Sequence, residues 1–374
     1  MEKMINRLRI VFVAESPGER PAKFAYGLRC NGFSCLLIHI ADLNFNPSIY
    51  FDYSIRCHSP MECVEIAKRL DPDIIHIFSF HADETALAIS RNLSCKIVYD
   101  YKDIFENMII HPADPLLWKN QRALIERADG LCCRDRQIDH YCQINNVTPR
   151  GKHILYLDYC YGINFPLTPK LGGADEVHTI CHGSFTPEDV YPQFSCNGLY
   201  LITEVLTQQK IHVHIYPGIW VTHALTNKKH SIYNELVRKN PYFHIHSHLT
   251  IENLIKEISQ YDIGLSLYQG EIFGIPDQYT IDNHQSYVMA ARLFDYLEAG
   301  LDILVQDNFL TMADVLQQYK FGKTVDCTYI FSDLKDKLLE LKHNTMRKEQ
   351  IAQARIDLSI ERHTNKLIDF YNSL

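Results

Sequence analysis

The sequence predicts an α/β protein built from two doubly wound domains, each a parallel β-sheet with helices on both faces. Three observations support this class. Short apolar runs of strand length alternate along the chain with stretches of helix-forming residues. This alternation occurs twice, before and after a stretch with prolines and glycines at residues 161–173. The chain has 374 residues, which is more than one hydrophobic core usually holds.

The first half of the chain contains the elements of one predicted domain. Apolar runs predict strands at residues 9–14, 34–40, 74–78 and 96–99. Helix formers occupy residues 22–31 and 85–92, and another helix ends at residues 67–70, before Asp71-Pro72-Asp73. Because strands separated by helices pair in parallel, these elements predict one parallel sheet.

The second half repeats the alternation. Its predicted strands are residues 179–181, 212–216, 243–245, 263–267 and 303–305. Residues 290–298 are helix formers, and Gly300 follows where a helix-ending residue is expected. Residues 344–374 form a last run of helix formers. We therefore expect domains at residues 1–165 and 166–345, followed by a helical segment at residues 346–374.

The composition is typical of a soluble globular protein, with 46% hydrophobic and 22% charged residues. The formal net charge of −8 argues against a nucleic-acid binder, because phosphate backbones attract basic surfaces. No apolar run is long enough to span a bilayer, and the first one, at residues 10–14, has the length of a strand and not of a signal peptide. We expect a cytoplasmic protein, and its basic start leaves a peripheral attachment to the inner membrane face open.

The twelve cysteines are scattered along the chain and form no Cys-x-x-Cys motif. They do not indicate a disulfide scaffold. In a chain without a predicted signal peptide, this pattern indicates reduced thiols, most of them buried as small hydrophobic residues.

A basic and an acidic residue lie one turn apart in the predicted helix at residues 290–298. Arg292 is in its first turn and Asp295 follows, so both side chains lie on one helix face. The pair suits a nucleoside diphosphate, with the cation on phosphate and the carboxylate on ribose hydroxyls. The simpler alternatives are a surface ion pair of Arg292 with Asp295 or Glu298, and a solvated Asp295 carboxylate.

Several segments occur in a definite order along the chain. In the second half, His182-Gly183 and Tyr216-Pro217-Gly218 follow the first two strands. Further along come HSHLTIENLIKEISQYDIGLSLY at 246–268 and ARLFDYLEAGLDIL at 291–304. The first half contains KIVYDYKDIFEN at 96–107 and LIERADGLCCRD at 124–135. The order of these segments resembles that of the GT-B glycosyltransferases, in particular glycosyltransferase family 4, over nearly the whole chain.

This resemblance implies a GT-B fold, in which two Rossmann-like domains face a cleft and a C-terminal helix crosses back to the first domain. The first domain binds the acceptor and the second binds the nucleotide sugar. The implied reaction moves a sugar from a UDP- or GDP-sugar to a glycan, lipid-linked or protein acceptor. It is expected to be retaining and to use no metal or other cofactor, since helix N-termini and a basic side chain hold the diphosphate.

The resemblance also assigns roles to residues at matching positions. The catalytic candidates are Lys102, Asp103 and Arg292. The turn Ser16, Pro17 and Gly18 is a candidate acceptor or phosphate loop, although one glycine also fits an ordinary turn. The donor-binding candidates are Gly183, Ser184, Tyr216, Pro217, His248, Leu249, Ser286, Tyr287, Val288, Arg292 and Asp295.

Some of these positions depart from the family pattern. Family 4 enzymes commonly carry the motif Glu-x7-Glu, and here Tyr287 and Asp295 replace its two glutamates. Arg292 replaces the usual lysine and keeps its positive charge. Lys102 replaces the active-site histidine, and the segment HGSFTPED at 182–189 lacks the usual basic pair. Lys102 would neutralise phosphate, or Asp103 would act as the general base. The alternative is an ion pair between them in a surface loop.

Histidines recur at alternate positions, at His212 and His214 and again at His244, His246 and His248. Alternate residues of a strand share one face. No acidic residue or cysteine accompanies them at ligand spacing, so we expect no metal site and place His248 beside the nucleotide base.

Three functions stay open at this point. The first is a glycosyltransferase. The second is a non-catalytic GT-B subunit or nucleotide-sugar-binding partner protein, which the departures at Lys102 and in HGSFTPED favour. The third is a sugar-nucleotide epimerase or hydrolase of the same fold, whose carboxylate-rich active site is not evident here.

Overall fold

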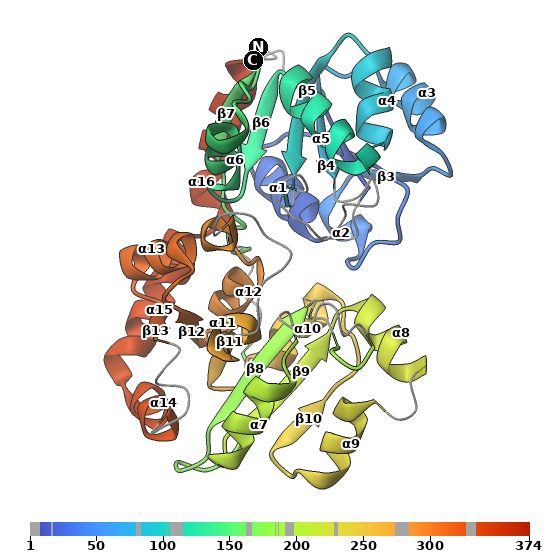
Figure 1. The fold of residues 1–374 in the computed structure, drawn as a ribbon. Coiled ribbons are helices and arrows are strands. Elements are labelled where there is room, and N and C mark those ends of the chain that lie inside the picture. The colour runs from blue at the N-terminus through green and yellow to red at the C-terminus, as the bar shows by residue number, and fades with distance from the viewer. Residues whose placement is uncertain are drawn as a thin grey trace. The chain divides into compact units, whose positions relative to one another are not determined.

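The computed structural model describes residues 8–15, 18–79, 84–101, 103–104, 115–161, 167–183, 185, 187–190, 198–227, 231–273, 284–326 and 334–374. The chain forms two compact units. Unit 1 comprises Met1–Gly162, Tyr279–Met289 and Leu358–Leu374, and unit 2 comprises Ile163–Gln278 and Ala290–Asp357. Each unit is a parallel α/β structure (Figure 1), as the alternation of apolar runs and helices predicts.

The sheet of unit 1 has seven parallel strands in the order β3-β2-β1-β4-β5-β6-β7. The predicted runs correspond to β1, β2, β4 and β5, whereas β3, β6 and β7 were not predicted. β3 and β7 are the edge strands and are largely exposed, so they lack a continuous apolar run. β6 has only four residues, two of them cysteines. The strands are β1 (Ile10–Ala14), β2 (Cys35–His39), β3 (Tyr53–Arg56), β4 (Ile74–Ser79), β5 (Lys96–Tyr101), β6 (Gly130–Cys133) and β7 (Lys152–Leu155).

Local sequence signals set the ends of the helices in unit 1. Before α3, the hydroxyl of Ser59 accepts a hydrogen bond from the Glu62 amide at 3.2 Å. After α3, Asp71 has a left-handed φ of 45° and ends the helix where the sequence predicts. The helices are α1 (Arg20–Cys30), α2 (Pro47–Tyr50), α3 (Pro60–Leu70), α4 (Glu84–Asn92), α5 (Pro115–Arg127), α6 (Gln137–Asn145) and α16 (Ile360–Asn372), with a 3-10 helix η3 (His284–Tyr287).

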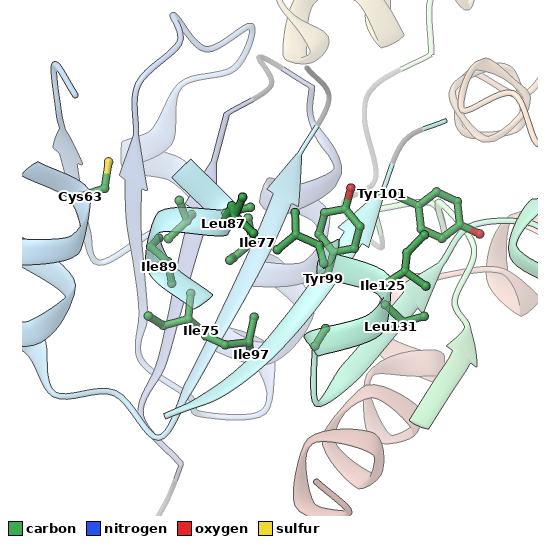
Figure 2. Close-up of a cluster of buried hydrophobic side chains, with 14 of the residues drawn as sticks. Cys63, Ile75, Ile77, Leu87, Ile89, Ile97, Tyr99, Tyr101, Ile125 and Leu131 are labelled. Carbon is green, nitrogen blue, oxygen red and sulfur yellow. The ribbon is translucent and has the colours of Figure 1, made fainter. Parts of the chain in front are cut away.

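One face of this sheet packs against apolar side chains of α3, α4 and α5. Ile75 and Ile77 of β4 and Ile97 of β5 lie in the same buried cluster as Leu87 of α4 and Ile125 of α5 (Figure 2). Burying a side chain of this size contributes about 1.5–3 kcal/mol. This layer holds the central strands together.

The opposite face of the sheet is covered by α1 and α16. Residues of β4 alternate between the two faces, so His76 and Phe78 point away from Ile75 and Ile77. The ring of Phe24 on α1 contacts the rings of His76 and Phe78 edge-on, with ring centres 5.2 and 5.3 Å apart. Nδ1 of His76 lies 2.5 Å from the Tyr371 hydroxyl on α16. The C-terminal helix thus packs on the first domain, which confirms the predicted return.

The predicted C-terminal helical run consists of two helices. The first, α15 (Thr345–Asp357), belongs to unit 2 and packs on α12, α13 and β12. The second is α16 of unit 1. Between them, the Cys160 amide donates to the carbonyl of Leu358 at 2.9 Å, and the Ile360 amide donates to the carbonyl of Cys160 at 2.8 Å. The chain therefore passes from unit 2 to unit 1 at Leu358.

The sheet of unit 2 has six parallel strands in the order β10-β9-β8-β11-β12-β13. All predicted strands of this half are present. The additional strand, β13, is a three-residue edge strand in which only Val325 is buried, so it left no apolar run in the sequence. The strands are β8 (His178–Gly183), β9 (His212–Pro217), β10 (Phe243–Ile245), β11 (Ile263–Ser266), β12 (Asp302–Gln306) and β13 (Lys323–Val325).

The helix that carries Arg292 and Asp295 is α12, within the predicted range 290–298. Gly300 follows its end with a left-handed φ of 69°, as predicted. The other helices of unit 2 are α7 (Tyr200–Gln208), α8 (Ile219–Asn227), α9 (Ile232–Lys239), α10 (Ile251–Ile258), α11 (Gln269–Phe273), α13 (Leu310–Tyr319) and α14 (Leu334–His343), and α12 is Arg292–Glu298.

Two further observations concern membranes and disulfides. In the described ranges, no helix combines the length and the apolar character needed to cross a membrane. Every cysteine that the structure describes is a free thiol, and most of these thiols are buried.

Gly264 of β11 is required for the close packing of α12. A Cβ atom at this position would lie 2.3 Å from ring carbons of Tyr296, a fully buried side chain of α12. We expect Gly264→Ala to lower the free energy of unfolding by about 1–3 kcal/mol, because the ring has no room to move. Urea unfolding measures this change. Gly173→Ala is the matched control, since a Cβ there meets nothing within 4 Å. Equal effects of the two substitutions would contradict the packing argument.

Candidate functional site

Predicted donor-binding residues lie together at the carboxyl edge of the unit 2 sheet. β8 and β9 pair in parallel with His182 opposite Tyr216 and Gly183 opposite Pro217. The ends of these two strands therefore lie side by side. In doubly wound sheets, ligands bind at this edge. Ser184, which follows Gly183, lies outside the described residues.

Gly183 ends β8 in a conformation that suits a ligand site. Its φ is 93°, in the left-handed region that glycine adopts without strain. A Cβ at this position would meet no atom of the described residues within 4 Å, so these residues leave open space above the α-carbon. Its carbonyl accepts a hydrogen bond from the Gly218 amide at 2.9 Å, which ties the end of β8 to the residue after β9.

Arg292 at the start of α12 contacts the end of β8. Its Nη1 donates to the sulfur of Cys181 at 3.3 Å. Burial by itself would lower the pKa of Arg292, but Cys181, Tyr296 and Asp295 outweigh it and raise the pKa. The guanidinium therefore stays charged beside the strand end.

Asp295, one turn further along α12, is buried and paired. Its side chain is 1% exposed, and its Oδ2 lies 3.3 Å from Nε2 of His182. The alternative of a solvated Asp295 carboxylate is therefore wrong. The Tyr296 hydroxyl accepts from the His182 amide at 3.1 Å and donates to the Leu265 carbonyl at 3.2 Å. These bonds fix the backbone of His182, whose ring lies next to the Asp295 carboxylate.

The remaining donor candidates divide between the two units. His248 and Leu249 lie in the loop after β10 of unit 2 and are half-buried. Ser286, Tyr287 and Val288 belong to unit 1 instead. There the ring of Tyr287 stacks on His140 with the ring centres 4.5 Å apart.

The candidates in unit 1 also lie after strands of its sheet. Asp103 follows β5, and its carbonyl accepts a hydrogen bond from Gln121 at 2.7 Å. Gly18 lies just before α1, in the connection that follows β1. Lys102, Ser16 and Pro17 lie outside the described residues, and so does the alternative ion pair between Lys102 and Asp103.

A buried ion network at the same edge of unit 1 was not predicted. Arg20, the first residue of α1, contacts Asp100 at 2.8 Å and Asp158 at 2.7 Å. Arg134, after β6, lies 3.6 Å from the second oxygen of Asp158. The partners are 80 and 138 residues apart in sequence. No local pattern could therefore reveal them.

Asp158 in this network predicts a pH dependence of stability. Burial alone would raise its pKa, but Arg134, Arg20 and Lys23 together lower it well below the ordinary value of 3.8. The unfolded chain binds a proton at a pH where folded Asp158 does not. We therefore expect the free energy of unfolding to fall as the pH drops below 3.8.

Urea unfolding between about pH 5 and about pH 3 measures this dependence. Arg134→Met removes one charge that lowers the pKa of Asp158, so its stability is expected to change less steeply with pH. An equal slope in both proteins would show that Arg134 is not needed to keep the pKa of Asp158 below this pH range.

His76, Asp100 and Cys132 in unit 1 also place potential metal-ligating atoms within 4.8 Å of one another. The guanidinium of Arg20 already lies against two of them, 2.8 Å from Asp100 and 3.8 Å from the sulfur of Cys132. Its positive charge takes the place of a metal cation at this cluster.

Comparison with known proteins identifies the fold. The sequence matches no protein-family model and no curated protein. Sucrose-phosphate synthase from Thermosynechococcus elongatus is similar in structure, with a TM-score of 0.65 and 11% sequence identity over 98% of both chains. A glycosyltransferase from Rickettsia africae has a TM-score of 0.63 and 12% identity, also over 98% of both chains.

The fold is shared by a protein of another class. The UDP-GlcNAc 2-epimerase from Methanocaldococcus jannaschii is similar with a TM-score of 0.50 and 10% identity, over 96% of this chain and 99% of that one. Identities this low establish a common fold and leave the reaction to be argued from the site. Two parallel α/β units and matches over nearly the whole length show that this chain has the GT-B fold.

Proposed function

We propose that this protein transfers a sugar from a nucleotide-sugar donor to the hydroxyl of an acceptor. One grouping at the carboxyl edge of the unit 2 sheet carries the proposal. It consists of Gly183 with open space above its α-carbon, the charged Arg292 and the buried carboxylate of Asp295. The fold supports the proposal by analogy, since glycosyltransferases are among the structures that share it.

In this proposal the donor diphosphate binds next to Arg292. When the sugar leaves, the diphosphate gains negative charge, and a fixed cation in a partly buried site stabilises that charge. Backbone amides around Gly183 and Ser184 add hydrogen-bond donors. Asp295 accepts hydrogen bonds from the ribose hydroxyls, and His182 holds its carboxylate in place.

Other parts of the donor and the acceptor are assigned by position. The nucleotide base binds at the loop of His248 and Leu249, and Tyr216 and Pro217 line the same edge. Unit 1 binds the acceptor, a glycan, a lipid-linked sugar or a protein, and Asp103 accepts the proton of its hydroxyl. A UDP- or GDP-sugar donor, retention of configuration and independence from metal follow from the resemblance to family 4.

A non-catalytic nucleotide-sugar-binding subunit is the second candidate. Lys102 stands where the family has its active-site histidine, and residues 182–189 lack the usual basic pair. These changes spare Arg292 and Asp295, so they affect transfer more than donor binding. Such a protein would bind the donor and act on an active partner.

The test is an incubation of purified protein with UDP- and GDP-sugars and a panel of glycan, lipid-linked and peptide acceptors. We expect nucleotide release that depends on an acceptor, together with a glycosylated product. Donor binding without turnover would establish the non-catalytic candidate. Conversion of the donor sugar without transfer would establish an epimerase instead.

A further inference from the structure

Histidines occupy one face of three neighbouring strands in unit 2. They are His178 of β8, His212 and His214 of β9, and His244 and His246 at the end of β10. The strand register pairs His178 with His212 and His214 with His244. Because alternate residues of a strand point to the same face, these imidazoles form one contiguous group. The alternating pattern in the sequence covers only the histidines of β9 and β10, so it does not reveal His178.

The imidazole rings contact one another through their nitrogens. Nδ1 of His178 lies 3.0 Å from Nε2 of His214, and Nδ1 of His214 lies 3.0 Å from Nε2 of His246. Nδ1 of His212 lies 3.1 Å from Nε2 of His244. The rings of His178 and His212 stack with their centres 4.3 Å apart.

Three of these residues have the spacing of a metal-ligand set. His178, His212 and His214 each offer one ring nitrogen, and the three atoms lie within 4.8 Å of one another. Zinc binds imidazole nitrogen at about 2.0–2.1 Å, which separates two ligands of a tetrahedral site by roughly 3.4 Å. Because the rings of His178 and His212 are stacked at an interplanar angle of 11°, binding one ion requires these rings to tilt until their nitrogen lone pairs converge.

Two of the three rings have a hydrogen-bond partner for their other nitrogen, and the third has a carboxylate nearby. A carboxylate oxygen of Glu176 lies 4.0 Å from Nε2 of His178, which has no hydrogen-bond partner among the described residues. His244 and His246 face Nδ1 of His212 and Nδ1 of His214. Metal-bound histidines usually donate their second N–H to such a partner, which fixes the ring and its tautomer. The ligand atoms are then Nδ1 of His178 and Nε2 of His212 and His214.

We propose that His178, His212 and His214 form a binding site for a divalent transition metal, with Zn²⁺ as the preferred ion. Imidazole ligands suit Zn²⁺, Cu²⁺ and Ni²⁺ and disfavour Mg²⁺ and Ca²⁺, which take oxygen ligands. The expectation of no metal site rested on the histidines of β9 and β10 alone, with no acidic residue or cysteine at ligand spacing. His178 of β8 now completes a set of three possible ligands.

The protonation of the rings agrees with metal binding. Burial, followed by the neighbouring His212, lowers the pKa of His178 to about 4. Burial and the surrounding histidines also lower the pKa of His214. Both imidazoles are therefore neutral at neutral pH, as a metal ligand must be.

The position of the site separates it from the proposed transfer reaction. His178 and His212 are the first residues of β8 and β9, whereas Gly183 and Pro217 are the last. At about 3.3 Å per residue, the two ends of β8 are roughly 16 Å apart. The metal joins adjacent strands at the amino edge of the sheet and stabilises unit 2, whatever the protein does at the carboxyl edge.

Calorimetric titration of the untagged, chelator-treated protein with Zn²⁺ tests this site. We expect one Zn²⁺ to bind per chain, and the affinity to fall at least tenfold in His212→Asn and His214→Ala. His153→Ala, which changes an exposed histidine of unit 1, is the control and is expected to bind as the wild type does. Absence of binding to the folded wild type, or unchanged binding in both site variants, would overturn the proposal.

A second measurement remains informative when a variant folds poorly. Because an ion that binds only the folded state raises the melting temperature, Zn²⁺ should raise the Tm of the wild type and of His153→Ala. It should raise the Tm of His212→Asn less at the same Zn²⁺ concentration; this substitution changes a half-buried residue and keeps a polar side chain. An equal Zn²⁺ shift in His212→Asn would contradict the site.

Discussion

Replacing Arg292 with alanine is expected to lower the turnover of a nucleotide-sugar donor by about 100- to 1000-fold. The guanidinium lies against Cys181 at the end of β8, next to the open space above Gly183. In the proposed reaction it would stabilise the leaving diphosphate from the position that this contact gives it. The loss should appear in kcat as well as in kcat/KM, because the charge it offsets develops as the bond breaks.

Arg292→Lys is the matched variant for this prediction. It keeps the charge and loses the planar donor pair, so turnover should lie between those of the wild type and the alanine variant. Melting temperatures of all three proteins separate catalysis from folding. Full activity of Arg292→Ala, or a loss of activity that only follows a loss of folded protein, would contradict the role assigned to Arg292.

The largest expected loss of stability comes from Arg20→Met. Arg20 lies between Asp100 and Asp158, and the side chains of both carboxylates are 2% exposed. Methionine fills much of the volume but leaves the buried Asp100 without its guanidinium partner and removes one of the cations beside the buried Asp158. Removing one partner of such a buried pair costs about 3–5 kcal/mol. Urea unfolding of the two proteins, compared at neutral pH, measures the difference.

Arg9→Met is the control for the Arg20 prediction. Arg9 also pairs with two aspartates, Asp71 and Asp73, but its side chain is 55% exposed. Water screens such pairs, so this variant should unfold almost as the wild type does. If both substitutions changed the free energy of unfolding by the same small amount, the buried ion pairs of Arg20 would stabilise the protein no more than the exposed pairs of Arg9. This result would contradict the prediction.

The central strands of both sheets could be predicted because buried parallel strands are apolar on both faces. β4 and β11 are examples, since their sequences IIHIFS and IGLS read directly as strands. β3 and β13 could not be predicted in this way. They lie at sheet edges, are partly exposed and have mixed sequences, so their pairing depends on neighbours that are distant in the chain.

The candidate site shows the same division between local and distant contacts. Gly183 and Pro217 follow strands in the sequence, and the parallel register brings them together without further information. The pairing of His182 with Asp295 joins two different elements of unit 2. A single sequence carries no signal for such a contact. Asp295 could be recognised as an acidic residue on α12, but not as a buried one.

The most direct test of the account is a thermal-melting screen of the purified protein against UDP, GDP, CMP, ADP and their common sugar conjugates. We expect one base to raise the Tm of the wild type selectively, since a ligand of the folded state stabilises it. The same nucleotide should give little or no shift in Arg292→Ala. No shift with any nucleotide, in wild-type protein shown to be folded, would contradict a nucleotide-sugar site at the carboxyl edge of the second sheet.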